Sequence, residues 1–142
     1  MTVRAILESK GRHVYSIEPD AKLSYAVSTL SQRRVGAVLV MSSTRVEGIL
    51  SERDVVRALS ERGAAALDLP VSAVMTREVV SCQPSDTVAI IMEAMTRGKF
   101  RHLPVMESDR LVGLISIGDV VKSRLTEYES EQQALHEYIK SA

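Results

Sequence analysis

The sequence predicts a mixed α/β (α+β) fold, in which two copies of one small β-α-β-β-α unit pack as a single module with a C-terminal helix. Three observations predict it: the chain repeats itself, both copies show the same order of strand and helix patterns, and each copy is too small to bury a sheet face alone. With 142 residues and an apolar fraction of 45%, the chain suffices for one compact domain or two very small ones.

The repeat is gapless over most of its length. Residues 14–59 align with residues 79–124 at a constant offset of 65. A short lead-in also repeats, because residues 3–7 resemble residues 71–75. The identical pairs include Ser16/Ser81, Pro19/Pro84, Val40/Val105, Arg45/Arg110, Gly48/Gly113, Ser51/Ser116 and Asp54/Asp119. We therefore divide the chain into a first repeat with its lead-in (1–69), a second repeat (70–125) and a polar helical tail (126–142).

Each copy opens with a short extended run and a helix. The run ends at a proline, which halts strand pairing, and the helix follows with apolar side chains at helical spacing. In the first copy the run is 14–17, the proline is Pro19, the predicted helix cap is Asp20 and the first apolar helix position is Leu23. In the second copy the run is 79–82, the proline is Pro84, the predicted helix cap is Ser85 and the first apolar helix position is Val88.

Two strands and a second helix complete each copy. Residues 42–45 and 107–110 are rich in turn-forming side chains and separate two apolar runs, which predicts a β-hairpin. The predicted strands are 37–41 and 46–50 in the first copy and 102–106 and 111–115 in the second, and the last helices begin near Ser51 and Ser116.

A Gly-x-x-Ser-x-x-Asp motif stands where the last strand of each copy ends and the last helix begins. Backbone amides and the positive dipole end at such a junction favour an anion, so Ser51 and Ser116 are predicted to contact phosphate. Asp54 and Asp119, one turn further on, can each accept both hydroxyls of a ribose. Phosphate beside ribose indicates a nucleotide. The alternative is an ordinary capping box, in which serine and aspartate satisfy each other's backbone N–H.

A cationic cluster precedes the hairpin of the second copy. Lys99, Arg101 and His102 could neutralise a phosphate, or they could be side chains of a solvated turn. The first copy has a glycine and an alanine where the second has Arg101 and His102, so the two sites are not expected to be equivalent. Arg53, which aligns with Gly118, is a further phosphate candidate, although a solvated helix surface is the commoner role for arginine.

Composition excludes several classes of function. The 18 basic and 18 acidic side chains cancel, and the chain has one phenylalanine and no tryptophan, which argues against a nucleic-acid or anionic-membrane surface. The single cysteine, Cys82, allows no internal disulfide and is predicted to pack in the core. We find no nucleophile with an adjacent base, no metal-ligand spacing, no signal peptide and no membrane span, and we expect a cytoplasmic, non-catalytic protein.

The duplicated unit resembles a tandem pair of CBS domains (cystathionine β-synthase type), most of all the stand-alone bacterial two-repeat form. The resemblance covers nearly the whole chain apart from the tail. The segments that carry it are Val74-Met75-Thr76, Ser81 to Pro84, Arg101 to Val105, and the two Gly-x-x-Ser-x-x-Asp motifs followed by Val-Val.

This resemblance implies a pseudosymmetric module with two clefts between the repeats, an adenine-nucleotide ligand (AMP, ADP, ATP, NAD(H) or S-adenosylmethionine) and a homodimer. It implies that Ser16 and Ser81, with neighbouring residues such as Val79 and Pro104, line adenine pockets. The expected function is a regulatory sensor that transmits its ligand state to a partner protein that the sequence does not identify. The alternatives are an interaction scaffold with vestigial pockets and, with little support from the residues, a nucleotide-processing enzyme.

Overall fold

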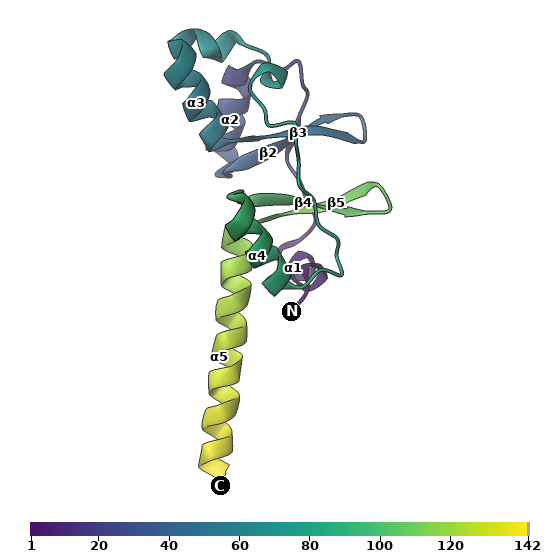
Figure 1. Cartoon of the computed structure of the whole chain (residues 1–142), viewed down its shortest axis with the longest axis vertical. Helices are drawn as coiled ribbons and strands as arrows, with labels where there is room; N and C mark the ends of the chain where they lie inside the picture. The colour runs from purple at the N-terminus through teal and green to yellow at the C-terminus, as the bar shows by residue number, and fades with distance from the viewer. Residues whose placement is uncertain (142) are drawn as a thin grey trace. The chain divides into compact units, whose positions relative to one another are not determined.

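The chain forms two compact units, each with its own hydrophobic core. The computed structural model describes residues 1–141 (Figure 1). The first-repeat unit comprises His13–Val80, and the second-repeat unit comprises Met1–Arg12 together with the chain from Ser81 onward. Each unit mixes helices with β-strands and contains its own copy of the repeat. The predicted fold class is therefore confirmed.

The first-repeat unit is built on a three-stranded sheet in the order β1-β2-β3. β1 runs parallel to β2, whereas β2 and β3 form the predicted antiparallel hairpin. The hairpin turn contains Ser43 at a φ of 56°. The elements of the unit are β1 (Ser16–Ile17), α2 (Leu23–Arg33), β2 (Ala37–Ser42), β3 (Arg45–Ser51) and α3 (Glu52–Arg62), followed by 3-10 helices over Gly63–Asp68 and Val71–Ala73.

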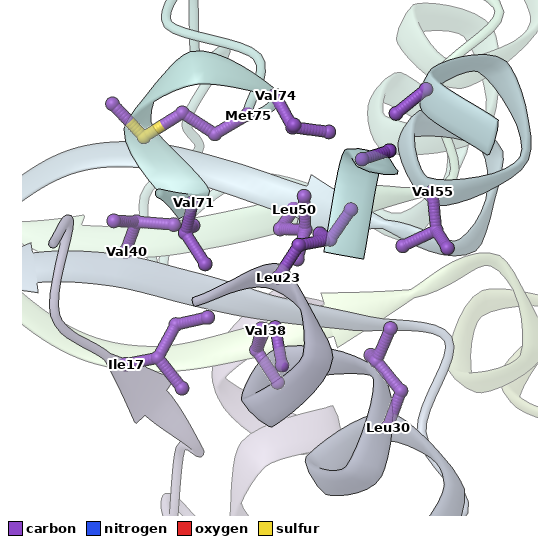
Figure 2. Packing of buried hydrophobic residues seen from close by; sticks show 13 residues of the cluster. Ile17, Leu23, Leu30, Val38, Val40, Leu50, Val55, Val71, Val74 and Met75 are labelled. Atoms are coloured by element: carbon purple, nitrogen blue, oxygen red, sulfur yellow. The ribbon is translucent and has the colours of Figure 1, made fainter. Parts of the chain in front are cut away.

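The core of this unit lies between the sheet and its helices (Figure 2). Leu23 of α2, Val38 of β2 and Leu50 of β3 are fully buried. The lead-in of the second repeat closes the same core with Val71, which is also fully buried, and with Met75. The segment 70–76 is therefore part of the packing of the first repeat.

The second-repeat unit repeats this arrangement with a shorter sheet. Its hairpin pairs β4 with β5 in the register of the first copy, so that His102 lies opposite Ser116 as Ala37 lies opposite Ser51. The first strand is reduced to one parallel bridge between Cys82 and Val105. The elements are α1 (Val3–Lys10), α4 (Val88–Gly98), β4 (His102–Glu107), β5 (Arg110–Ser116) and α5 (Ile117–Ser141).

Each lead-in packs on the core of the other copy. α1 belongs to the first repeat by sequence, yet Val3 and Leu7 are buried in the second-repeat unit. A Cβ atom on Gly113 would stand 2.6 Å from Leu7, and one on Gly48 would stand 2.7 Å from the backbone oxygen of Thr76. The compact units therefore differ from the division into 1–69 and 70–125, which follows the sequence repeat.

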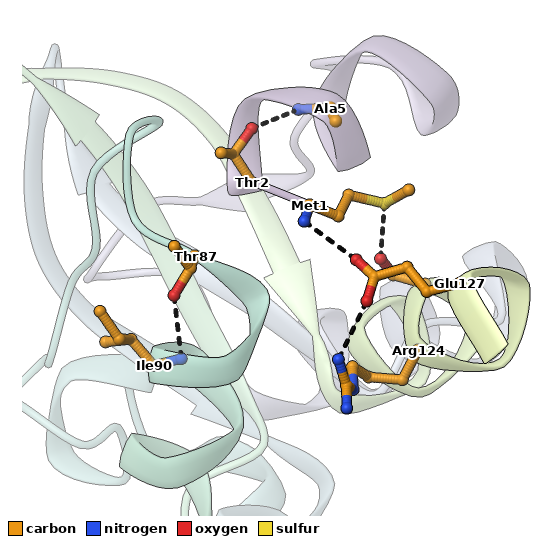
Figure 3. Close-up of polar contacts among 8 residues, drawn as sticks. Met1, Thr2, Ala5, Thr87, Ile90, Arg124 and Glu127 are labelled. Atoms are coloured by element: carbon orange, nitrogen blue, oxygen red, sulfur yellow. Dashed lines mark hydrogen bonds and ion pairs between the residues drawn. The ribbon is translucent and has the colours of Figure 1, made fainter. Parts of the chain in front are cut away.

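The last helix is longer than the repeat predicts. α5 runs without a break from Ile117 to Ser141, so the predicted boundary at residue 126 falls inside one helix, drawn from green to yellow in Figure 1. Ala142 lies outside the described residues. Near its start α5 is tied to the N-terminus, where the Met1 ammonium lies 3.0 Å from Glu127 and Arg124 pairs with the same carboxylate at 2.9 Å (Figure 3).

The two predicted helix caps are wrong. Asp20 lies in a turn closed by the bond from the Ala21 N–H to the Glu18 carbonyl, and α2 begins after Lys22. Ser85 lies in the matching turn after Pro84, and α4 is capped instead by Thr87, whose hydroxyl accepts from the Ile90 N–H at 3.3 Å (Figure 3). In both copies the proline is followed by a full turn before the helix starts.

Candidate functional site

Both Ser-x-x-Asp motifs form the reciprocal bonds of a capping box. In the first repeat the Asp54 carboxylate accepts from the Ser51 N–H at 3.0 Å, and Ser51 Oγ accepts from the Asp54 N–H at 3.4 Å. In the second repeat the corresponding distances for Ser116 and Asp119 are 2.9 and 3.2 Å. The capping interpretation is therefore confirmed as local structure. The ability to bind a nucleotide then depends on whether each carboxylate still has an oxygen that can accept a further hydrogen bond.

The Asp54 carboxylate is saturated by groups of its own unit. It is 3% exposed and accepts from Arg57 Nη2 at 2.7 Å and from Thr76 Oγ1 at 3.1 Å, in addition to the bonds from Ser51. Arg57 lies one turn further along α3, whereas Thr76 arrives with the second lead-in. A ribose could reach this carboxylate only by displacing one of these donors.

The Asp119 carboxylate is held differently. Its Oδ2 accepts from Lys10 Nζ at 2.6 Å, and the same ammonium donates to the Leu114 carbonyl at 2.9 Å. The Asp119 side chain keeps 23% of its surface exposed, and within residues 1–141 its Oδ1 accepts no hydrogen bond. Burial raises the pKa of Asp119, but the bonds from Lys10 and Ser116 outweigh burial and leave the pKa below its ordinary value. This carboxylate is ionised at neutral pH and has an oxygen available.

The cationic cluster lies beside this second motif. The Arg101 carbonyl accepts from the Ile117 N–H at 2.8 Å, and His102 is the cross-strand partner of Ser116. Arg101 is exposed and His102 is partly buried. Four predicted residues, Arg101, His102, Ser116 and Asp119, thus meet at the junction of β5 and α5, together with Lys10.

The remaining predicted phosphate ligands are less closely grouped. Lys99 ends α4 in the left-handed conformation, with a φ of 56°, and is exposed two residues before Arg101. Arg53 is exposed on α3, next to Glu52 and Val56, on a shallow hollow formed by that one helix.

The predicted adenine-pocket residues fall in both units. Ser81 and Pro104 come close together because the Cys82 N–H donates to the Pro104 carbonyl at 3.0 Å. Ser16 pairs with Leu39, the residue that aligns with Pro104, in the first-repeat unit. Val79 also belongs to the first-repeat unit, and the side chain of Pro104 is buried. Their role in adenine binding stays a prediction.

Three residues that hold the carboxylates were not predicted from the sequence as site residues: Lys10, Arg57 and Thr76. Arg57 could have been found, because it stands three residues after Asp54 on the same helix face. Lys10 and Thr76 are distant in sequence from the aspartates that they contact and belong to the lead-ins. No local pattern shows on which copy a lead-in packs.

Comparison with known proteins identifies the family. The sequence pattern of the CBS domain matches residues 3–61 and again residues 71–126. A CBS domain-containing protein from Arabidopsis mitochondria is 31% identical over 147 residues, covering 97% of this chain and 71% of that protein. The chain belongs to the CBS-domain family and carries two copies of the domain.

Solved structures of similar proteins have the same fold. A CBS-domain containing protein from Agrobacterium tumefaciens is 48% identical, with a TM-score of 0.85 over 87% of this chain and 92% of that chain. A CBS domain protein from Pyrobaculum aerophilum, complexed with AMP, is 27% identical, with a TM-score of 0.74 over 84% of this chain and 89% of that one. Among residues 1–141, no helix combines the length and apolarity needed to cross a membrane.

Proposed function

We propose that the chain is a non-catalytic regulatory module that binds an adenine nucleotide. One observation carries the proposal: at the start of α5 the ionised carboxylate of Asp119 has an open oxygen and is bonded by Lys10 and Ser116, and the backbone of Arg101 bonds the adjoining Ile117. A carboxylate that can accept from ribose hydroxyls, next to cations that can face phosphate, fits a nucleotide. The AMP complex of the Pyrobaculum aerophilum protein supports this class of ligand.

The geometry favours the second repeat over the first as the site of ribose binding. Asp54 has its donors supplied by Ser51, Arg57 and Thr76, whereas Asp119 has one charged donor on a flexible stem, Lys10. We infer that Lys10 turns from Asp119 toward the phosphate when a nucleotide binds. The ligand would be AMP, ADP, ATP, NAD(H) or S-adenosylmethionine, since ribose and phosphate contacts are shared among most of them.

As a regulator, the module would act by binding its ligand more tightly in one conformation than in another, and a partner protein would respond to the difference. We propose that it works as a homodimer in the cytoplasm. The saturated carboxylate of Asp54 favours a second candidate, an interaction scaffold with vestigial pockets, at least for the first repeat.

Calorimetric titration tests the proposal. The purified protein is titrated with AMP, ADP, ATP, NAD, NADH and S-adenosylmethionine, and at least one is expected to bind with a dissociation constant below about 1 mM. Asp119→Asn is expected to weaken that binding about 10- to 100-fold, because a hydrogen bond to a charged group contributes roughly 1.5–3 kcal/mol. Asp54→Asn is expected to change the affinity less than about twofold.

The matched control is Asp109→Asn, which changes an exposed aspartate in the β4–β5 turn and should leave binding unchanged. Circular dichroism confirms that each variant is folded. Titrations with no heat, at unchanged fold, would support the scaffold instead. Equal losses in the Asp119 and Asp109 variants would refute the assignment of Asp119 to ribose.

A further inference from the structure

An apolar stripe runs along the exposed side of α5. Its members are separated by alternate steps of four and three residues, the spacing of a coiled-coil seam, with the polar Gln132 filling one position. The apolar side chains are Val121 (45% exposed), Leu125 (56%), Tyr128 (60%), Leu135 (53%) and Ile139 (63%). Large apolar side chains in such a regular row are unusual on a surface that only meets water.

The stripe faces away from the core of its own unit. Val120 and Ser123 are the buried residues of α5, and Glu127 holds the Met1 ammonium on the same side (Figure 3). At 100° per residue, the centre of these three positions lies about 125° around the helix from the centre of the stripe. The body of the second-repeat unit therefore leaves the stripe open along its whole length.

We propose that α5 pairs through this stripe with α5 of a second copy of this chain, as a parallel, in-register two-stranded coiled coil. In this arrangement Leu125, Gln132 and Ile139 occupy the a positions, and Val121, Tyr128 and Leu135 occupy the d positions. Each residue then meets its own counterpart. Gln132 pairs with Gln132, and a polar pair at one a position favours a single register.

The charges that flank the stripe select the parallel orientation. In a parallel pair, each g residue faces the e residue five positions later in the other helix. Arg124 then faces Glu129, and Glu131 faces His136. An antiparallel pair centred on the middle of the stripe would instead bring Glu129 against Glu129 and Glu131 against Glu131, which is repulsive. Arg124 bonds Glu127 of its own helix at 2.9 Å through one of its five N–H groups and keeps the others for Glu129.

The proposal goes beyond nucleotide binding and does not rest on it. Cysteine cross-linking of the full chain tests it. The native Cys82 is 4% exposed and burial raises its pKa to about 12, so this thiol should stay inert. Leu135→Cys places a thiol at a d position, and Ser130→Cys places an equally accessible one on the outer side of the helix. Under mild oxidation at micromolar protein, L135C is expected to form a disulfide-linked dimer at least about tenfold faster than S130C.

Equal rates for the two variants, or no dimer with L135C, would overturn the proposal. A second experiment separates the orientations. In the antiparallel pair centred on the stripe, residue 125 of one helix lies opposite residue 135 of the other, so mixed L125C and L135C chains would cross-link to each other rather than each to its own kind, and that result would also overturn the proposal. Sedimentation supplies an independent measurement, since Leu125→Glu with Leu135→Glu is expected to weaken self-association more than tenfold. Nucleotide titration of the same variants shows whether binding survives, so the two proposals can fail separately.

Discussion

The carboxylates of Asp54 and Asp119 stand at equivalent places in the two repeats but have different neighbours. Asp54 is closed in by a guanidinium and a hydroxyl, whereas Asp119 is held by a single ammonium, from Lys10. A saturated, buried carboxylate stabilises the fold, and an ionised, half-open one can also exchange its partner for a ligand. Part of the difference arises from the lead-ins, which supply Thr76 and Lys10, and part arises from Arg57, which belongs to α3.

Replacing Lys10 should reveal this contact through the pH dependence of stability. The folded-state pKa of Asp119 lies below the ordinary value of 3.8, so the contact contributes stability above that pH, and the contribution is lost as the pH falls through the lowered pKa. Lys10→Met is expected to lower the free energy of unfolding at pH 7 by less than about 1 kcal/mol, because both side chains are partly exposed. Urea unfolding at pH 7 and pH 2.5 should show the difference from the wild type shrinking at the acid pH.

Lys22→Met is the control for this measurement. Lys22 is 67% exposed and lies 3.9 Å from Asp68, so its removal should change stability little at either pH. A Lys10→Met effect of the same size at both pH values would contradict the proposed role of the pair.

At the scale of elements, the glycines of the two motifs make room for the lead-ins. Gly48 lies in β3, where the backbone of Thr76 pairs with Ile49 through two bonds of 2.9 Å. Gly113 lies in β5 against Leu7 of α1. The glycine of each Gly-x-x-Ser-x-x-Asp motif therefore serves packing, while the serine and the aspartate shape the start of the next helix.

Substituting these glycines should have unequal costs. A Cβ at Gly48 would lie 2.7 Å from a backbone oxygen, which cannot move without breaking the pairing with β3, whereas a Cβ at Gly113 would meet only the end of the Leu7 side chain. We expect Gly48→Ala to lower the free energy of unfolding by about 2–3 kcal/mol and Gly113→Ala by about 1 kcal/mol. Urea denaturation measures both.

Gly118→Ala is the matched control, because its new Cβ would stand 3.6 Å from Ser116 Oγ, at ordinary contact distance. Alanine is the better helix former, so this variant should be neutral or more stable by up to about 1 kcal/mol. If Gly113→Ala lowered the free energy of unfolding more than Gly48→Ala, the close approach of the Thr76 backbone would not be the reason that position 48 requires glycine.

The sequence predicted those elements whose signals are local. The hairpins followed from turn chemistry between two apolar runs, and the strand-to-helix junctions followed from Ser51 and Ser116. The caps Asp20 and Ser85 were wrong because a proline followed by a polar residue is equally compatible with a turn that precedes the helix. The full set of hydrogen bonds to Asp54 could not be predicted, since Thr76 comes close to this carboxylate only because the second lead-in packs on the core of the first repeat.

At the scale of the whole molecule, the two repeats exchange their lead-ins. The first-repeat unit is continuous in sequence, from His13 to Val80, whereas the second-repeat unit needs both the start of the chain and the segment from Ser81 onward. A chain cut at the boundary of the sequence repeat, after residue 69, would separate Val71 and Met75 from the core that they close. It would also leave Val3 and Leu7 of α1 without the core in which they are buried.

Two fragments of nearly equal length should therefore behave differently. Residues 13–80 contain the whole first core and are expected to unfold cooperatively, with a lower midpoint than the intact chain because so small a unit buries little surface. Residues 1–69 lack Val71 and Met75 and expose the apolar face of α1, so we expect no cooperative transition. Thermal unfolding followed by circular dichroism distinguishes the two.

Val71→Asp in the 13–80 fragment is the control, since it places a charge at a fully buried position and should abolish the transition. Cooperative folding of 1–69 with no folding of 13–80 would show that each lead-in stabilises its own repeat.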